Sequence, residues 1–214
     1  MKDNIILDIK PNEDIPGRRT KFTLILGYNG CGKSTIAVKL MKAALKNGGS
    51  GLIVTPDPIE WRSLDYADVS KTITFKGFKR TIFGKSIYRG NEIKYYGTLA
   101  HINKNFKSGA ILFDDCRPYI GYATQCDIST LNIRRRQMNA DIFATGHGVT
   151  QVPPEFFTFA SDFILFQTWD KIDRKAIYIQ DYDIIAEMQE RVNTISSREK
   201  NIHYFEHYKR KMGG

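Results

Sequence analysis

Residues 21–40 read KFTLILGYNGCGKSTIAVKL, and this stretch decides the fold. An apolar run comes first and apolar residues at helical spacing come last, which predicts a buried strand, a turn and a helix. The turn between them, residues 27–34 (GYNGCGKS), fits the GxxxxGKS/T phosphate-loop pattern at every position. The sequence therefore predicts a nucleotide-binding protein.

The residue types in this turn suit phosphate binding. Glycines let successive backbone N–H groups point into one concavity, and the start of the following helix adds a partial positive charge. Lys33 is expected to reach the β- and γ-phosphates, and the Ser34 hydroxyl is expected to bind Mg²⁺. The predicted nucleotide-binding residues are Gly27, Asn29, Gly30, Cys31, Gly32, Lys33, Ser34 and Thr35.

Length and composition favour one domain. The chain has 214 residues, enough for one α/β domain with a sizeable core and short for two. The three cysteines lack zinc-type spacing, which indicates a reducing, intracellular setting, and the net charge of +9 permits a polyanionic partner without establishing one. We expect no signal peptide and no membrane span. The expected domain covers residues 1–214, with a core at about 20–170 and a C-terminal extension at about 171–214.

Strand and helix patterns alternate along the chain. This alternation predicts an α/β fold with a mainly parallel central sheet flanked by helices. Besides the first strand and helix, we expect strands at residues 4–9, 52–54, 110–113, 141–145, 163–166 and 202–208, and helices at 99–106, 129–138, 155–160 and 184–192.

Two carboxylates follow the apolar run at residues 110–113, as in a Walker B strand. An apolar run places a strand inside a parallel sheet, and α/β sheets bind ligands at the carboxyl ends of their strands. Asp114 is therefore expected to hold Mg²⁺, and Asp115 to orient or deprotonate the attacking water. The alternative is an acidic pair in a turn.

The predicted strand at residues 141–145 ends in a polar residue and is followed by Gly-His-Gly. If it lies beside the Walker B strand, Thr145 is the first candidate for a group that senses the γ-phosphate, and His147 is the second. The alternative is that both residues cap a loop.

Basic and aromatic residues alternate between residues 71 and 97, with a candidate hairpin turn at Gly90-Asn91. One interpretation is a loop that contacts nucleic acid, with cations on phosphates and rings available for stacking. The other is a solvated hairpin at the edge of the sheet, where lysines discourage aggregation. The residues alone leave both open.

The segment 203–207 (HYFEH) matches HxxEH, a metalloprotease pattern that functions on a helix. Here the surrounding residues alternate like a strand, so we interpret the match as chance.

The spacing of the motifs narrows the class of phosphate-loop protein. About 80 residues separate Lys33 from Asp114, and the sensor-like strand follows about 30 residues later, which leaves room for an extra strand between the two Walker strands. That arrangement is typical of RecA-like ATPases. The guanine-reading NKxD motif is absent, because Asn103-Lys104 is followed by Asn105-Phe106.

The chain resembles the FtsK–HerA superfamily of DNA-pumping ATPases. The segments that carry the resemblance are GYNGCGKST, VTPDP, ILFDD, RRRQMNADIFATGH and VPPEFFTFASDFILF, within residues 20–170. Within this group the chain is most similar to the packaging ATPases of tailless, membrane-containing double-stranded DNA viruses. The resemblance implies a RecA-like core, ATP and Mg²⁺ as cofactors, a ring of identical subunits, and hydrolysis coupled to DNA translocation. It also implies a cytoplasmic protein, associated with the virion and a capsid vertex if the chain is viral.

The resemblance also implies an arginine, ahead of the sensor strand, that reaches the neighbouring subunit's nucleotide. Arg135 and Arg136 fit that place; the alternative is a surface patch or a DNA contact. The chain departs from the family pattern at two positions, the second Walker B acid and the residues after the sensor threonine. Asp115 stands where many relatives have Glu, and Gly146-His147 follows Thr145 where many have Gln.

Other functions remain open at this point. The filamentous-phage assembly ATPases are also similar, although they usually carry a transmembrane segment. A small phosphotransferase (kinase) would use residues 71–97 as a lid. A non-catalytic, nucleotide-gated adaptor would bind ATP without hydrolysing it.

Overall fold

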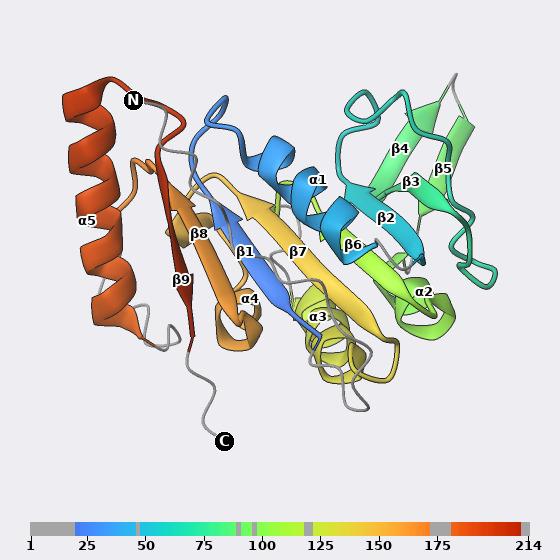
Figure 1. Ribbon diagram of the computed structural model, residues 1–214. Helices are drawn as coiled ribbons and strands as arrows, with labels where there is room; N and C mark the ends of the chain where they lie inside the picture. The colour runs from blue at the N-terminus through green and yellow to red at the C-terminus, as the bar shows by residue number, and fades with distance from the viewer. Residues whose placement is uncertain are drawn as a thin grey trace.

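A seven-stranded sheet forms the centre of the molecule (Figure 1). The computed structural model describes residues 20–45, 48–88, 91–95, 98–117, 122–171 and 181–210. The strands of the sheet are β1 (Phe22–Leu26), β2 (Ser50–Thr55), β3 (Gly77–Ile82), β6 (Gly109–Phe113), β7 (Ala140–Gly146), β8 (Asp162–Phe166) and β9 (Phe205–Lys209). They lie in the order β3-β2-β6-β7-β1-β8-β9, and every neighbouring pair is parallel except β8 and β9.

Helices cover both faces of this sheet. Helix α1 (Lys33–Ala44) packs on one face, over β6 and β7, whereas α2 (Thr98–Asn105), α3 (Tyr122–Arg134) and α4 (Pro154–Phe159) lie on the other (Figure 1). Helix α5 (Tyr182–Glu199) packs against β8 and β9 at one end of the sheet. The α/β class and the mainly parallel sheet predicted from the sequence are confirmed. None of the described helices has the length and apolar character that crossing a membrane requires.

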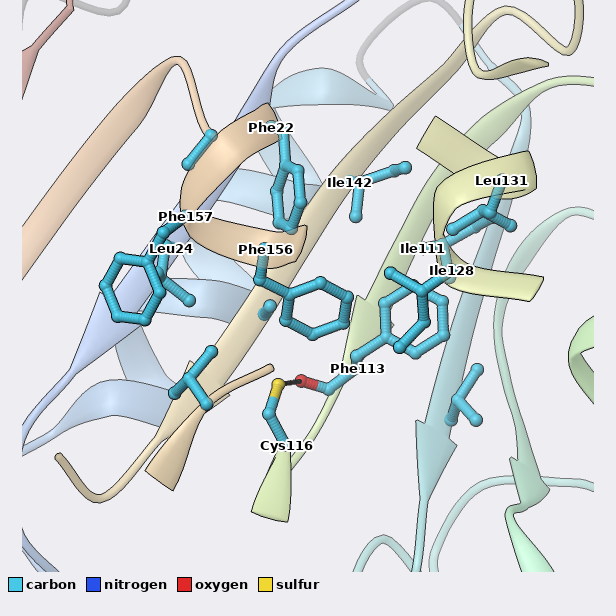
Figure 2. Packing of buried hydrophobic residues seen from close by; sticks show 14 of the residues in the cluster. Phe22, Leu24, Ile111, Phe113, Cys116, Ile128, Leu131, Ile142, Phe156 and Phe157 are labelled. Atoms are coloured by element: carbon cyan, nitrogen blue, oxygen red, sulfur yellow. Dashed lines mark hydrogen bonds between the residues drawn. The ribbon is translucent and has the colours of Figure 1, made fainter. Parts of the chain in front are cut away.

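The strands are buried on both faces because their side chains alternate between two apolar clusters. Leu24 packs on the α4 side of the sheet, whereas Ile25 packs on the α1 side. Figure 2 shows the first of these clusters, where Phe156 of α4 lies between Phe22 and Phe113. Its ring centroid is 5.2 Å from that of Phe22 and 5.8 Å from that of Phe113. These aromatic contacts fix α4 over the centre of the sheet.

The strand order places the functional motifs together. Strand β7 lies between β1, which precedes the phosphate loop, and β6, which precedes Asp114. The extra strand predicted between the two Walker strands is therefore present. Because β1, β2, β6 and β7 are parallel, their carboxyl ends meet at one edge of the sheet, where ligands bind in this class of fold.

Several predicted boundaries were wrong. Helix α3 begins at Tyr122 and ends at Arg134, instead of spanning 129–138, because its first turns (YATQCD) carry no clear apolar stripe. Helix α5 continues to Glu199 rather than ending at 192, and β9 begins at Phe205 after a turn at 202–203. The strand predicted at 4–9 lies outside the described residues.

The basic and aromatic segment, residues 71–97, divides into two parts. Strand β3 joins the sheet as its edge strand, parallel to β2, which the sequence did not predict. Strands β4 (Gly84–Tyr88) and β5 (Asn91–Tyr95) form a separate antiparallel hairpin, as expected. Asn91 pairs with Tyr88, so it belongs to β5 rather than to the turn.

Candidate nucleotide-binding site

The phosphate loop is held by hydrogen bonds to the two strands beside β1. The Gly27 N–H donates to the Gly146 carbonyl at 3.1 Å, and the Tyr28 N–H donates to the Gln167 carbonyl at 3.0 Å. Gly32, the residue just before α1, has a φ of 106°, a left-handed conformation that glycine adopts without steric cost. Contacts within the protein therefore define the shape of the loop.

Cys31 supports this loop from beneath. It is fully buried, and a Cβ added to Gly27 would lie 2.7 Å from its sulfur and 2.5 Å from the Cβ of Phe166. Only glycine fits at position 27 for this reason. Burial raises the pKa of the Cys31 thiol, which keeps it neutral and packed like a small apolar side chain.

Lys33 is folded back onto the loop. Its Nζ donates a 2.9 Å hydrogen bond to the Tyr28 carbonyl, and only 8% of the residue is exposed. Burial lowers the pKa of Lys33, while the nearby charges of Asp114 and Asp115 act in the opposite direction. The ammonium group is thus held at the phosphate loop, facing the two acids that follow β6.

Asp114 is fixed by a hydrogen bond on each carboxylate oxygen. Its Oδ1 accepts from the Thr145 hydroxyl at 2.7 Å, and its Oδ2 accepts from the indole N–H of Trp61 at 2.7 Å. The Thr145 hydroxyl also accepts from the Asp115 N–H at 3.0 Å, so it joins β7 to both acids. Asp114 is 4% exposed, and this buried carboxylate has a single, well-defined orientation.

Asp115 and His147 face each other across the ends of β6 and β7. The Nε2 atom of His147 lies 3.6 Å from Oδ1 of Asp115. That oxygen is buried without a hydrogen-bond partner among the residues that the structure describes, and the Asp115 backbone is left-handed, with a φ of 46°. An unpaired buried oxygen and an unusual backbone conformation are typical of functional positions.

A pocket of about 350 Å³ lies between the phosphate loop and these acids. Most of the residues predicted from the sequence line it together. Gly27 and Cys31 do not line it, because they form the underside of the loop, and Arg135 and Arg136 lie elsewhere. The lining residues are Asn29, Gly30, Gly32, Lys33, Ser34, Thr35, Glu60, Asp114, Asp115, Thr145 and His147.

The two candidate arginines lie at the opposite edge of the sheet, in the turn before β7. Arg135 is 7% exposed and donates a 3.0 Å hydrogen bond to the Phe159 carbonyl, and burial lowers its pKa. Of the two, only Arg136 is exposed to solvent.

Sequence reasoning missed two residues in the loop after β2: Glu60, which lines the pocket, and its neighbour Trp61. Partial burial, followed by the negative charges of Asp114 and Asp57, raises the pKa of Glu60 to about 7. Trp61 has a φ of 60°, a strained conformation for a bulky residue, and bonds Asp114. The one available signal was their place just after a buried strand, at the ligand-binding edge of the sheet.

A second pocket, of about 340 Å³, adjoins the first and shares Asn29 and His147 with it. Its wall includes the rings of Tyr28 and Trp169, whose centroids are 5.8 Å apart. Trp169 is 79% exposed. This aromatic extension was also not predicted.

The HxxEH residues lie on the turn before β9 and on β9 itself, not on a helix. The Nδ1 atom of His203 lies 3.0 Å from the Cys31 carbonyl, and Nε2 of His207 lies 3.1 Å from Oδ1 of Asp162. The two histidines thus have separate partners. Within the described part of the chain, no group of three or more His, Cys, Asp or Glu residues is arranged to hold a metal ion.

Comparisons with known proteins find likeness in structure alone. No protein-family model matches the sequence, and no curated protein does. Among solved structures, B204, the DNA-packaging ATPase from Sulfolobus turreted icosahedral virus, superposes with a TM-score of 0.62 at 17% identity, over 88% of this chain and 92% of that one. The genome packaging NTPase B204 from Sulfolobus turreted icosahedral virus 2, in complex with ATP-gammaS, gives 0.60 at 16% identity, over the same shares of the two chains. The chain therefore has the fold of these viral packaging NTPases.

Proposed function

We propose that this protein is an Mg²⁺-dependent ATPase that moves double-stranded DNA, and that it packages a viral genome. One observation carries the proposal: a pre-shaped phosphate loop and an oriented Asp114–Thr145 pair line one pocket in a sheet of RecA-like strand order. The fold is that of two viral B204 proteins, of which one is described as a DNA-packaging ATPase and the other has been solved with ATP-gammaS. That likeness supports the choice of ATP and of DNA.

In this proposal the phosphates of ATP bind the backbone N–H groups of the loop and the N-terminus of α1. Lys33 moves from the Tyr28 carbonyl to the β- and γ-phosphates. The Ser34 hydroxyl and Asp114 would hold Mg²⁺, since Mg²⁺ prefers hard oxygen donors. The bound ion would neutralise charge that develops on the phosphates during the reaction.

Asp114 suits Mg²⁺ because hydrogen bonds already fix the orientation of its carboxylate. Asp114 is held by Thr145 and Trp61, which is the type of outer support that orients a metal-binding carboxylate. Asp115, Thr145 and His147 line the side of the pocket where the γ-phosphate would lie. We assign Thr145 and His147 to sensing that phosphate, because a change at Thr145 reaches both acids through hydrogen bonds.

We further propose a ring of identical subunits in which an arginine from one subunit completes the site of the next. Arg136 is the candidate because it is exposed, whereas Arg135 is engaged inside its own subunit. Such an arginine contributes about 10³- to 10⁵-fold to the rate in other phosphate-loop enzymes. Arg136→Ala should therefore abolish turnover and leave ATP binding intact.

For the DNA contact we propose the basic and aromatic segment, residues 71–97. The described side chains narrow the candidates within it. Lys76 is exposed, whereas Arg80 is 6% exposed and donates to two backbone carbonyls inside the protein. Arg80 is therefore a structural residue. A capsid vertex remains the proposed docking partner of the ring.

The test is steady-state ATP hydrolysis with and without long double-stranded DNA, at two salt concentrations. Lys33→Ala serves as the inactive reference. We expect DNA to stimulate hydrolysis, and we expect the stimulation to fall steeply with salt, because contacts to DNA phosphates release counterions. A rate of ATP hydrolysis that is the same with and without DNA, at both salt concentrations, contradicts the proposed DNA motor and favours a kinase or an adaptor.

A further inference from the structure

The loop that follows β2, residues 56–64, brings a third acid to the pocket. Strand β2 is parallel to β6 and hydrogen-bonded to it, with Val54 opposite Phe113. Their carboxyl ends therefore lie side by side, and the residues that follow β2 reach the acids that follow β6. Glu60 lines the same pocket as Lys33 and Asp115.

The main chain of Glu60 is held from both sides. The Asp57 carboxylate accepts from the Ile59 N–H at 2.7 Å, which closes the first turn of the loop. The Nη1 atom of Arg80 donates to the carbonyls of Pro58 and Glu60, at 2.8 Å each. A buried arginine is thus used to fix the backbone of this one loop.

The neighbouring residue ties the loop to the site itself. Trp61 keeps a left-handed backbone, with a φ of 60°, while its indole bonds Oδ2 of Asp114. Arg80 is in turn placed by the ring of Tyr66, whose centroid lies 4.4 Å from its guanidinium carbon. Strain of this kind persists where surrounding contacts over-determine the conformation, and such positions cluster at functional sites.

The three acids of the pocket differ in the hydrogen bonds and the burial of their carboxylate oxygens. Both oxygens of Asp114 already accept hydrogen bonds. Asp115 buries one oxygen, Oδ1, beside His147. Glu60 has the longest side chain of the three, stands on a fixed backbone, and lines the pocket together with the phosphate loop. Its carboxyl group is hydrogen-bonded to Asp114 and also borders the open pocket, where a water molecule can reach it.

We infer that Glu60, and not Asp115, orients the water that attacks the γ-phosphate and accepts its proton. The inference rests on the proposed ATPase function. The water oxygen forms a bond to the γ-phosphorus as the bond from that phosphorus to the β–γ bridging oxygen breaks. ADP leaves with the electron pair, inorganic phosphate forms, and the proton passes to the Glu60 carboxylate. Asp115 then serves to position His147.

The experiment compares Glu60→Gln and Glu60→Asp with the wild type and with Asp115→Asn. Hydrolysis is measured at saturating ATP and Mg²⁺, and binding of ATP with Mg²⁺ is measured by the thermal shift that it produces. Glu190→Gln, on the exposed face of α5, is the matched control for a Glu-to-Gln change. Its rate should equal that of the wild type.

We expect Glu60→Gln to lose about 10²- to 10⁴-fold in kcat while it keeps the thermal shift from ATP. Glu60→Asp should retain part of the rate, because the carboxylate remains but is shorter. Asp115→Asn should lose less than Glu60→Gln. The inference alone is overturned if the wild type hydrolyses ATP and Glu60→Gln does so within threefold of it. Loss of the thermal shift in Glu60→Gln also overturns it, since that result assigns Glu60 to ligand binding. If the wild type binds ATP and never hydrolyses it, the proposed function fails as well.

Discussion

The indole N–H of Trp61 donates a 2.7 Å hydrogen bond to Oδ2 of Asp114, and this contact joins the loop after β2 to the carboxylate at the end of β6. Asp114 is also bonded by Thr145 of β7. Three adjacent strands thus converge on one carboxylate. Asp114 is the proposed magnesium ligand, and these two hydrogen bonds hold its carboxylate in one orientation.

Trp61→Phe removes the indole donor and keeps an aromatic ring in the loop. Without that donor, Asp114 keeps only the hydrogen bond from Thr145. Hydrogen bonds that orient a metal-binding carboxylate contribute about 10- to 100-fold to metal affinity or activity. We expect the Mg²⁺ concentration for half-maximal hydrolysis to rise by about that factor. Trp169→Phe, at the chain's other tryptophan, should leave it unchanged. Equal Mg²⁺ dependence in the two variants would argue against a role for Trp61.

Thr145→Val tests the bridge between β7 and the two acids. Valine matches the shape of threonine but cannot bond Asp114 or the Asp115 N–H, which leaves a buried carboxylate short of a donor. We expect the free energy of unfolding to fall by about 1–3 kcal/mol and kcat to fall at least about tenfold. Thr145→Ser should restore both quantities. A valine variant with wild-type kcat would remove Thr145 from the mechanism.

The raised pKa of Glu60 predicts a pH-dependent stability change in the protein without nucleotide or Mg²⁺. The acids around Glu60 are Asp57, Asp114 and Asp115, and Lys33 is the facing cation. The folded protein holds a proton on Glu60 more tightly than the unfolded chain does. The free energy of unfolding should therefore fall as the pH rises from about 4.5 to about 7, and the loss should be complete above that range.

Glu60→Gln should remove this loss. At pH 8 the variant should be more stable than the wild type, by ~1 kcal/mol at most because Glu60 is partly in solvent. That gain corresponds to a rise in Tm of about 2–4 °C for a chain of this size. At pH 4 the two melting temperatures should coincide. A variant that melts below the wild type at pH 8 would contradict the assignment of this pKa.

His203→Ala tests whether the turn before β9 supports the phosphate loop. The imidazole Nδ1 lies 3.0 Å from the Cys31 carbonyl, inside that loop. Loss of one such hydrogen bond is worth about 1 kcal/mol, so ATP affinity should fall by roughly fivefold. His207→Ala, whose partner is Asp162 on β8, should keep wild-type affinity. A zinc chelator should not change the ATP affinity of either variant. Unchanged ATP affinity in His203→Ala would show that the phosphate loop keeps its binding conformation without this hydrogen bond.

The parts of the site that the sequence predicted are those defined by short-range patterns. The phosphate loop is one continuous segment, and its glycines and Lys33 can be interpreted from their spacing. Asp114 and Asp115 follow an apolar run, which marks the end of a buried strand. Thr145 could be predicted as a neighbour of Asp114 because consecutive parallel strands usually pair, as β6 and β7 do here.

What the sequence did not predict depends on contacts across the fold. Glu60 and Trp61 belong to no spacing pattern, and only the pairing of β2 with β6 brings them to the acids. Arg80 sits in a basic, aromatic segment that is typical of a surface, yet strand β3 pairs with β2 and turns Arg80 inward. The burial of Arg135 could not be predicted either, because nothing in a run of three arginines indicates which one is buried.

The most direct test of the central claim is displacement of a third DNA strand from a triplex. A protein that moves along a duplex under ATP hydrolysis removes the third strand in its path. We predict displacement by the wild type with ATP and Mg²⁺, none by Lys33→Ala, and none by the wild type with a non-hydrolysable ATP analogue. Hydrolysis that DNA stimulates, without any displacement by the wild type, would contradict the claim that this protein moves DNA.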